Sequence, residues 1–526
     1  MATPQSHSRT RLTSKPRIQI PKPMLYPELV FGLIGPAGTD LDLVIEVLTT
    51  ELKAVDYGVE VIRLSKLIEE FLHHDFSKRY EDDRISRLMT DGSRIRELSG
   101  RGDAIAILSV SEIARRREYI TKNRYVAASR TAYILRSLKH PQELRMLKSI
   151  YGRGFFAISV YSPREERVNA LAERINRSRH LKEQGARSKA EALIERDERE
   201  EGTDLGQDVS DAFPLSDFFI DGRLKPRLQK DTKRLIEILF QFPYHTPTGE
   251  EYAMYHAKAA ALRSAALSRQ VGAVIASEHY DILAVGCNEV PKAGGGLYWT
   301  GDDPDGRDFQ LGADTSNLVR QEILNEILDR FQKHKWLSKK YAKAPLDHLL
   351  NDLLFGNQQK VLRNSRVLHL IEFGRSVHAE MAALMDASRR GVSVKGATLF
   401  STTFPCHLCA RHIVASGIKR VVYIEPYPKS KVRELHPDSI VVDQQNVTPG
   451  YVNFEPFVGV APRQYLELFE MPDERKDKRG KVVDWHASAK SPKVIRFLST
   501  YILLEMRLIG EVIPEIRKTV RKLSHT

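Results

Sequence analysis

Four side chains that lie close together in the sequence have the types and the spacing of a metal-centred hydrolytic site. His378 and Glu380 form a His-x-Glu pair, and Cys406 and Cys409 form a Cys-x-x-Cys pair that follows Pro405. One imidazole and two thiolates supply three zinc ligands and leave a fourth position open for water, as catalytic zinc sites do. Glu380 then stands beside the metal without being a ligand. The pattern predicts catalytic zinc, with Glu380 as the group that moves protons.

The segments around these residues are expected to place both pairs at the starts of helices. Residues 378–390 have helical spacing of apolar residues and are followed by Gly391, which can cap a helix. Residues 397–402 are expected to form a strand, and Pro405 suits the first turn of the next helix. Residues 381–404 provide enough chain for one helix, a turn and a strand. The two helix starts can therefore meet at one edge of a sheet.

Either motif alone also occurs in different kinds of site. A Cys-x-x-Cys pair is as often a redox motif or half of a structural zinc site, but a closed structural site needs a fourth protein ligand. His407 and His412 are the only histidines close to the cysteines in sequence, and His407 lies on a different helical face from them. Catalytic zinc is therefore the preferred interpretation.

A helix and a β-hairpin are expected before the metal motifs. Residues 250–269 are helical and rich in alanine, and residues 270–275 and 281–285 have the pattern of two paired strands. Asn288 follows the second strand, where it is either a substrate contact or a turn-forming asparagine. Cys287 is expected to be a small buried residue and not a metal ligand.

The two metal motifs, together with the hairpin before Asn288, resemble the cytidine and deoxycytidylate deaminase family in its deoxycytidylate-type branch. The resemblance implies a three-layer α/β/α zinc domain over residues 236–475, with Glu380 as the catalytic residue and Asn288 as a contact to the sugar of the nucleotide. The zinc ligands that it implies are His378, Cys406 and Cys409. Residues 315–370 are mostly helical and exceed what the compact family requires, so they are interpreted as an insertion and a candidate for oligomer contacts.

Residues 28–235 are expected to form a separate regulatory α/β domain. Apolar runs with the character of buried strands lie at 29–33, 57–64, 103–109, 133–138 and 154–161. Helical segments alternate with these runs, which predicts a mostly parallel sheet covered on both faces.

The first of these strands leads into a turn with the layout of a phosphate-binding loop. Gly35, Gly38 and Thr39 are the phosphate-loop-like residues, because they lie between a strand and a helix. Leu41 and Asp42 stand where such loops carry lysine and Ser/Thr, so ordinary ATP hydrolysis is not expected. The domain resembles a degenerate P-loop kinase domain, and its fusion to a deaminase resembles bacterial anti-phage deoxycytidine nucleotide deaminases.

The composition is that of an ordinary globular protein. The 526 residues suggest two to four domains, and the formal charge of +13 suggests an anionic partner. Three cysteines indicate a reducing compartment. No apolar run approaches the ~20 residues of a membrane span. A cytoplasmic location without a membrane partner is therefore expected. Residues 1–27 are expected to be a disordered basic tail, and residues 476–526 a helical extension.

The resemblance implies zinc-dependent hydrolytic deamination of dCTP, and also of dCMP, which would deplete the dCTP pool as a defence against phage. The alternatives are a housekeeping dCMP deaminase, a cytidine deaminase that edits RNA or DNA, and a nucleotide kinase with an accessory zinc domain. Besides Zn²⁺ and a deoxycytidine nucleotide, the expected partners are a regulatory nucleotide or an inhibitory RNA, and further copies of this chain. The amino-terminal half is expected to restrain the deaminase, since unregulated loss of dCTP is toxic.

Overall fold

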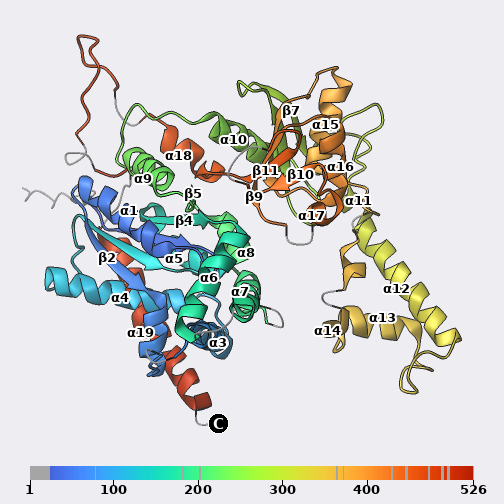
Figure 1. Ribbon diagram of the computed structural model, residues 1–526, viewed down its shortest axis with the longest axis horizontal. Helices are drawn as coiled ribbons and strands as arrows, with labels where there is room; N and C mark the ends of the chain where they lie inside the picture. The colour runs from blue at the N-terminus through green and yellow to red at the C-terminus, as the bar shows by residue number, and fades with distance from the viewer. Residues whose placement is uncertain are drawn as a thin grey trace, which may run out of the picture.

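The structure, a computed structural model, consists of two α/β bodies and a helical arm (Figure 1). It describes residues 24–524 except 77–78, 180–182, 201–202, 363–364, 371, 428–429, 445–447, 472–473, 487–490 and 494–497. The first 23 residues of the expected basic tail therefore lie outside the described residues. Among the residues described, no helix combines the length and the apolar character that a membrane crossing requires.

The amino-terminal body is built on five parallel strands in the order β2-β3-β1-β4-β5. These strands are β1 (Leu29–Ile34), β2 (Gly58–Arg63), β3 (Thr131–Arg136), β4 (Phe155–Tyr161) and β5 (Phe218–Asp221). Along β1, Phe31 and Leu33 pack into the core on one face of the sheet, whereas Val30 and Ile34 pack into the core on the other. The expected parallel sheet with continuous apolar strands is confirmed.

Helices cover both faces of this sheet. Their bounds are α1 (Leu41–Ala54), α2 (Leu64–Leu72), α3 (Glu81–Ser99), α4 (Ala104–Thr121), α5 (Pro141–Tyr151), η1 (Gly152–Gly154), α6 (Arg164–Arg179), α7 (Glu183–Glu198), α8 (Val209–Ala212), η2 (Phe213–Leu215) and α9 (Lys225–Leu239). α1 and α9 share a core with Phe31 and Leu33, and α2, α4 and α5 share the core on the opposite face. α6 and α7 pack together and onto α3 through a smaller core.

The strand expected over residues 103–109 is wrong, because these residues form the start of α4. Most of the first half of α4, from Ala104 to Ile113, is buried. A helix that is apolar on all sides lacks the one-sided periodicity that identifies a helix in a sequence. Its apolar run therefore looks the same as that of a buried strand.

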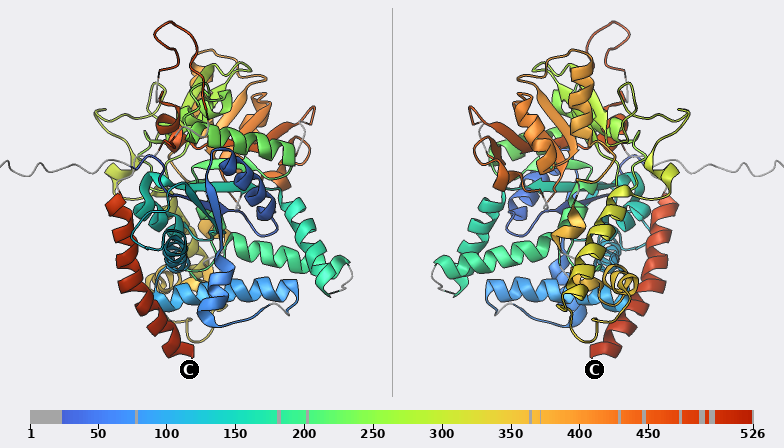
Figure 2. Two further views of the ribbon diagram at one scale, coloured as in Figure 1. Left: turned by 90° about the vertical axis from the view of Figure 1, so that its left-hand side faces the viewer. Right: turned by 90° about the vertical axis from the view of Figure 1, so that its right-hand side faces the viewer.

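The chain returns to the amino-terminal body after it has built the second body. β12 (Gly459–Val460) pairs antiparallel with β5, and α19 (Leu498–Ser524) lies along α3, α4 and α5 (Figures 1 and 2). Tyr501, Ile502 and Ile513 of α19 belong to the same buried core as the apolar residues of α4. The carboxy-terminal helix thus completes the amino-terminal body.

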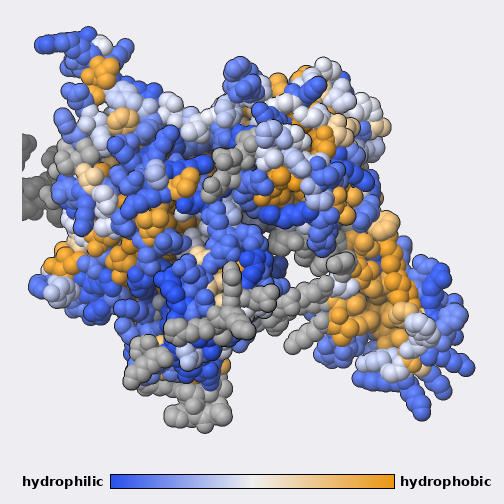
Figure 3. All heavy atoms as spheres, viewed as in Figure 1, coloured by the Kyte–Doolittle hydropathy of each residue, from blue (hydrophilic) through white to orange (hydrophobic). Residues whose placement is uncertain are grey.

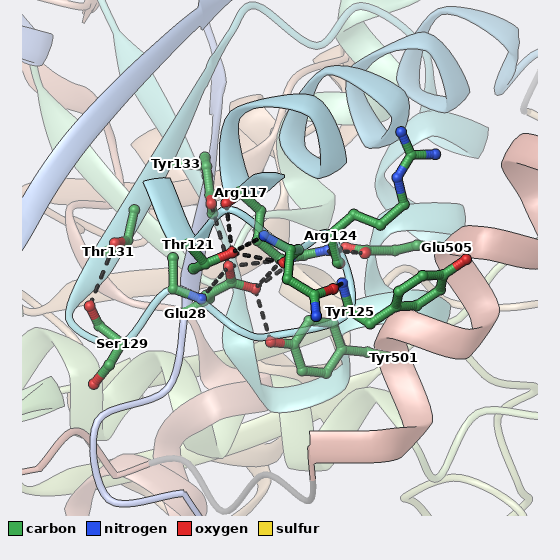
Figure 4. Close-up of polar contacts among 12 residues, drawn as sticks. Glu28, Arg117, Thr121, Arg124, Tyr125, Ser129, Thr131, Tyr133, Tyr501 and Glu505 are labelled. Carbon is green, nitrogen blue, oxygen red and sulfur yellow. Dashed lines mark hydrogen bonds and ion pairs between the residues drawn. The ribbon is translucent and has the colours of Figure 1, made fainter. Parts of the chain in front are cut away.

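A buried cluster of charges joins α19 to this body (Figure 4). Arg117 on α4 donates hydrogen bonds to Glu28 at 2.8 Å and to Glu505 on α19 at 2.5 Å. Tyr501 on α19 and Tyr133 on β3 also donate to Glu28, at 2.7 and 3.2 Å. The side chains of Arg117, Glu28 and Glu505 are at most 1% exposed. One buried guanidinium therefore lies between two buried carboxylates where three distant segments of the chain meet.

The central body is built on a second sheet, with strand order β10-β11-β9-β8-β6-β7. Its strands are β6 (Gly272–Ala276), β7 (Ile282–Cys287), β8 (Thr398–Thr403), β9 (Arg420–Glu425), β10 (Ile440–Val442) and β11 (Val452–Pro456). β6 is antiparallel to β7 and β8, and the remaining pairs are parallel. This arrangement confirms the expected hairpin and the strand expected over residues 397–402.

Helices cover both faces of the central sheet as well. They are α10 (Gly249–Ala261), α11 (Asp308–Leu311), α15 (Ala379–Arg389), α16 (His407–Ala415), α17 (Val432–Leu435), η4 (Pro462–Gln464) and α18 (Tyr465–Phe469). On β6, Ala273 and Ile275 share a core with α15 and α16, and Val274 and Ala276 share a core with α10. This alternation is what a strand buried on both faces requires.

Residues 315–370 form the helical arm, which extends away from the central body (Figure 1). It contains α12 (Thr315–Lys333), α13 (Leu346–Leu354), α14 (Gln359–Leu362) and η3 (Arg366–His369). Apolar side chains gather on the visible face of α12 and α13 (Figure 3), and Trp336 and Phe355 are 77% and 70% exposed. These residues are helical as expected, and their interpretation as an insertion stays a prediction.

Candidate active site

The three expected zinc ligands converge at the starts of two helices. His378 directly precedes α15, Cys406 directly precedes α16, and Cys409 lies in the first turn of α16. The Sγ atoms of Cys406 and Cys409 lie 3.3 and 3.4 Å from Nδ1 of His378. In a tetrahedral site with ordinary Zn–S and Zn–N bond lengths, these atoms are about 3.6 Å apart. The donor set and its spacing therefore fit a zinc ion.

Local backbone structure explains why these side chains are free to bind a metal. His378 and Cys406 stand at N-cap positions in extended conformation, and neither caps its helix with its side chain. Gly286 on β7 allows α15 to lie close to the sheet, because a Cβ at this glycine would be 2.3 Å from the carbonyl oxygen of Ala379. The start of α15 is thereby held at the edge where α16 begins.

The electrostatics of the site favour a thiolate. A hydrogen bond from Cys409, together with His378, holds the pKa of Cys406 at about 4. The hydrogen bond to Cys406 correspondingly raises the pKa of His378 to about 9 in the metal-free protein. Among the described residues, the group of potential ligands that lie within 4.8 Å of one another contains only His378, Cys406 and Cys409. Three protein ligands leave a fourth tetrahedral position for water or substrate.

Glu380 lies in the first turn of α15 and is almost completely buried, at 4% exposure. Burial raises the pKa of its carboxyl to about 7, and the neighbouring thiolate of Cys406 adds to the rise. A carboxyl group with a pKa near neutrality can both accept and donate a proton at physiological pH. Glu380 thus has the properties of a general acid and base beside the metal ligands.

A cavity of about 440 Å³ opens onto this group, a size within the range of small-molecule sites. His378, Glu380 and Cys406 form one part of its wall, and Asn288 and Arg269 from the hairpin side form another. The cavity therefore brings all of the sequence-predicted residues of this body except Cys409 onto one surface.

Asn288 has a structural role that the sequence did not reveal. Its side-chain amide donates to the carbonyl oxygen of Arg269 at 2.8 Å and accepts from the backbone N–H of Val271 at 2.7 Å. The asparagine thus holds the segment that leads into β6 at the cavity. Its contact to the sugar of a nucleotide stays a prediction.

Part of the cavity wall comes from the helical arm. Asp314, at the N-cap of α12, and Ser316, Arg320, Leu368 and Leu370 within the arm all line the cavity. These residues belong to no motif, so the sequence contained no signal that places them near the metal ligands. The arm was expected to serve oligomer contacts, which stays a prediction.

Gly35, Gly38 and Thr39 lie in the turn between β1 and α1 of the amino-terminal body and do not line the cavity of the metal ligands. Gly38 has a φ of +91°, and a Cβ at this position would lie 2.5 Å from the carbonyl oxygen of Arg167 on α6. α6 therefore closes directly over the turn.

A carboxylate of the protein engages the donors around this turn. Asp197 on α7 accepts a hydrogen bond from the backbone N–H of Ala37 at 2.7 Å and another from Nζ of Lys139 at 2.8 Å. The side chain of Asp40 also accepts from the first N–H groups of α1. A bound phosphate would have to compete with the buried carboxylate of Asp197 and with the negative charge of Asp40.

Comparisons with known proteins find similarity in the central body. Residues 247–425 match the family model described as the cytidine and deoxycytidylate deaminase zinc-binding region. The deoxycytidylate deaminase of Enterobacteria phage T4 is 49% identical over 55 residues, which are 10% of this chain and 28% of that protein. The deoxycytidylate deaminase of Saccharomyces cerevisiae is 25% identical over 316 residues, which are 59% of this chain and 78% of that protein. The chain thus spans less than a third of the phage relative.

Among solved structures, the dCMP deaminase from the cyanophage S-TIM5 in complex with dCMP and dUMP is 17% identical. The similarity covers 41% of this chain and 100% of that chain, with a TM-score of 0.22, which supports no residue-level comparison. The matching family model and the converging ligands agree on the metal. Residues 247–425 match the zinc-binding region of the cytidine and deoxycytidylate deaminase family, and the cofactor of the site is zinc.

Proposed function

We propose that this protein deaminates deoxycytidine nucleotides by hydrolysis, converting dCTP to dUTP and dCMP to dUMP. The observation that carries the proposal is the buried Glu380 beside the converging side chains of His378, Cys406 and Cys409. Of these four residues, all but Cys409 line one small-molecule cavity. This arrangement lies within the region that matches the deaminase family model. It combines a metal position, a proton-transfer group and space for a nucleotide.

The proposed chemistry assigns every proton transfer to Glu380. When bound, zinc lowers the pKa of water and so supplies a nucleophile near neutral pH. Glu380 accepts the proton that this water loses and donates it to N3 of the cytosine ring. As the C4–N bond breaks, Glu380 takes the proton of the new hydroxyl at C4 and passes it to the departing amine, which leaves as ammonia while a carbonyl forms at C4. The net reaction consumes one water and releases one ammonia.

Two observations support a free nucleotide as the substrate. The relatives with matching segments include proteins called deoxycytidylate deaminase from phage and yeast. Arg269 and Arg320 line the cavity and provide cations for phosphate groups. Binding of single-stranded nucleic acid requires aromatic platforms along a basic channel. The aromatic residues of this lining are Phe404 and Tyr427, which do not form such a series.

We further propose that consumption of dCTP by this enzyme limits DNA synthesis, including that of an infecting phage, and that the amino-terminal body restrains the activity. Deleting this body is an unsuitable test of restraint, because β12 and α19 would lose the sheet edge and the helices against which they pack. The proposed consumption of dCTP can be tested without disturbing the fold. Cells that express the wild type are compared with cells that express Glu380→Gln, and nucleotide pools and phage plating are measured in both.

The direct test of the activity is ammonia release from a panel of dCMP, dCDP, dCTP, CTP and a cytosine-containing oligonucleotide. Release from dCTP and dCMP by the wild type, and its loss in Glu380→Gln, are the expected results. Asp386→Asn is the matched control, because it makes the same chemical change on α15 at a residue paired with Arg389 and Arg390, outside the cavity. Release from the oligonucleotide alone would overturn the proposal in favour of an editing enzyme.

A further inference from the structure

We propose that the helical arm completes the substrate site and that Arg320 on α12 determines its preference for nucleotides with more than one phosphate. The inference rests on the proposed deamination of deoxycytidine nucleotides and adds a specificity-determining residue to it. Without the arm, the cavity beside Glu380 would lose the wall formed by Ser316, Arg320 and Leu368.

The arm holds Arg320 in place with neutral groups only. The guanidinium donates to the carbonyl oxygen of Ser316 at 3.0 Å, to the carbonyl oxygen of Leu368 and to the side-chain oxygen of Asn317. None of the ion pairs formed within the described part of the chain includes Arg320, although many of its arginines are paired with carboxylates. Arg320 lines the cavity, and none of these ion pairs neutralises its positive charge.

The acidic residues that line the cavity near the arm are already engaged. Asp308 accepts from Arg375 at 3.0 Å and from Ser376. Asp314 caps α12 by accepting from the backbone N–H of Ser316 at 2.9 Å. These contacts leave the charge of Arg320 available to an anionic ligand.

A second cation reaches the same cavity from a different segment. Arg269 precedes β6 and is 56% exposed, and its carboxylate partner, Glu425, is 3.6 Å away. One guanidinium is sufficient to bind the phosphate of a monophosphate, whereas a triphosphate presents more anionic oxygens over a greater length. Two arginines held by separate elements therefore suit the longer anion, since guanidinium–phosphate hydrogen bonds are charge-assisted and strong.

The test compares dCTP and dCMP in Arg320→Gln, which removes the charge, and in Arg320→Lys, which retains it. Loss of a charge-assisted contact is expected to raise the KM for dCTP roughly 10- to 100-fold, with less than about a threefold change for dCMP and little change in kcat. Arg320→Lys is expected to retain part of the preference. Arg330→Gln is the matched control, because Arg330 lies on the same helix, pairs with Glu326 and is 70% exposed.

Several outcomes would overturn the inference. Equal losses for dCTP and dCMP in Arg320→Gln would show that Arg320 only supports the arm, and unchanged kinetics would show that it does not contact the substrate. If Arg320→Gln fails to fold, Arg320→Lys decides, because it keeps the charge and loses the guanidinium fork. Equal changes in the KM for dCTP and for dCMP in Arg320→Lys would then contradict the inference. Absence of deamination in the wild type contradicts the proposed function itself, so the two failures are distinguishable.

Discussion

Replacing Arg117 with methionine is predicted to destabilise the amino-terminal body severely. Arg117 is the single guanidinium between the buried carboxylates of Glu28 and Glu505, and it donates five hydrogen bonds to them (Figure 4). Removing one partner of a buried ion pair costs about 3–5 kcal/mol, because it leaves an uncompensated charge without solvent. Methionine fills a similar volume, so the loss is chiefly electrostatic.

The penalty should depend on pH in a defined direction. Burial already raises the pKa of Glu505 above its ordinary value in the presence of Arg117, and without the guanidinium the pKa must rise further. A carboxyl whose pKa is higher in the folded state binds more protons there than in the unfolded chain, so stability falls as the pH rises from the unfolded pKa to the folded one. Arg117→Met should therefore be closer to the wild type at pH 5 than at pH 8.

The assay is urea unfolding followed by the fluorescence of Trp485, whose indole N–H donates to the carbonyl oxygen of Phe240 in this body. Circular dichroism recorded in parallel shows whether both signals report one transition. Arg115→Met is the control on the same helix, since Arg115 is 71% exposed and exposed ion pairs contribute less than about 1 kcal/mol. A stability within about 1 kcal/mol of the wild type for Arg117→Met, or a penalty that grows at acidic pH, would refute the electrostatic reasoning.

Two further predictions concern the metal and the amino-terminal loop. Treatment with a chelator should remove zinc and activity together, and added Zn²⁺ should restore both. Cys409→Ser should bind zinc more weakly, because it removes a thiolate ligand. Metal analysis together with ammonia release checks both expectations, and full activity of the zinc-free protein would contradict them. The wild type should show no binding of ATP by isothermal titration calorimetry, because Asp197 occupies the Ala37 N–H; tight binding would contradict this account of the loop.

The zinc ligands could be predicted because their geometry depends on short segments. Gly391 is expected to end one helix and Pro405 to begin the next. Because only one strand lies between these helices, their starts, which carry the ligands, can meet at one edge of the sheet. The structure has this arrangement, with β8 between α15 and α16. Local spacing thus carried nearly all of the information about His378, Cys406 and Cys409.

The return of the chain to the amino-terminal body could not be predicted in the same way. β12 contains two residues, and its pairing with β5 depends on contacts between segments far apart in sequence. In the sequence, Glu505 is one charged residue within an apolar segment, and its partner Arg117 lies 388 positions away. Such packing follows from the assembled tertiary structure and has no local signature. For the same reason, the position of Arg320 on the cavity could not be predicted.

The most direct test of the central claim is ammonia release from dCTP and dCMP by the wild type and by Glu380→Gln, with zinc measured in the same samples. Loss of the proton-transfer group is expected to lower kcat about 10²- to 10⁴-fold, while zinc stays at one ion for each set of His378, Cys406 and Cys409. Unimpaired turnover in a zinc-loaded Glu380→Gln protein, or no ammonia from any cytosine nucleotide with the wild type, would contradict the account.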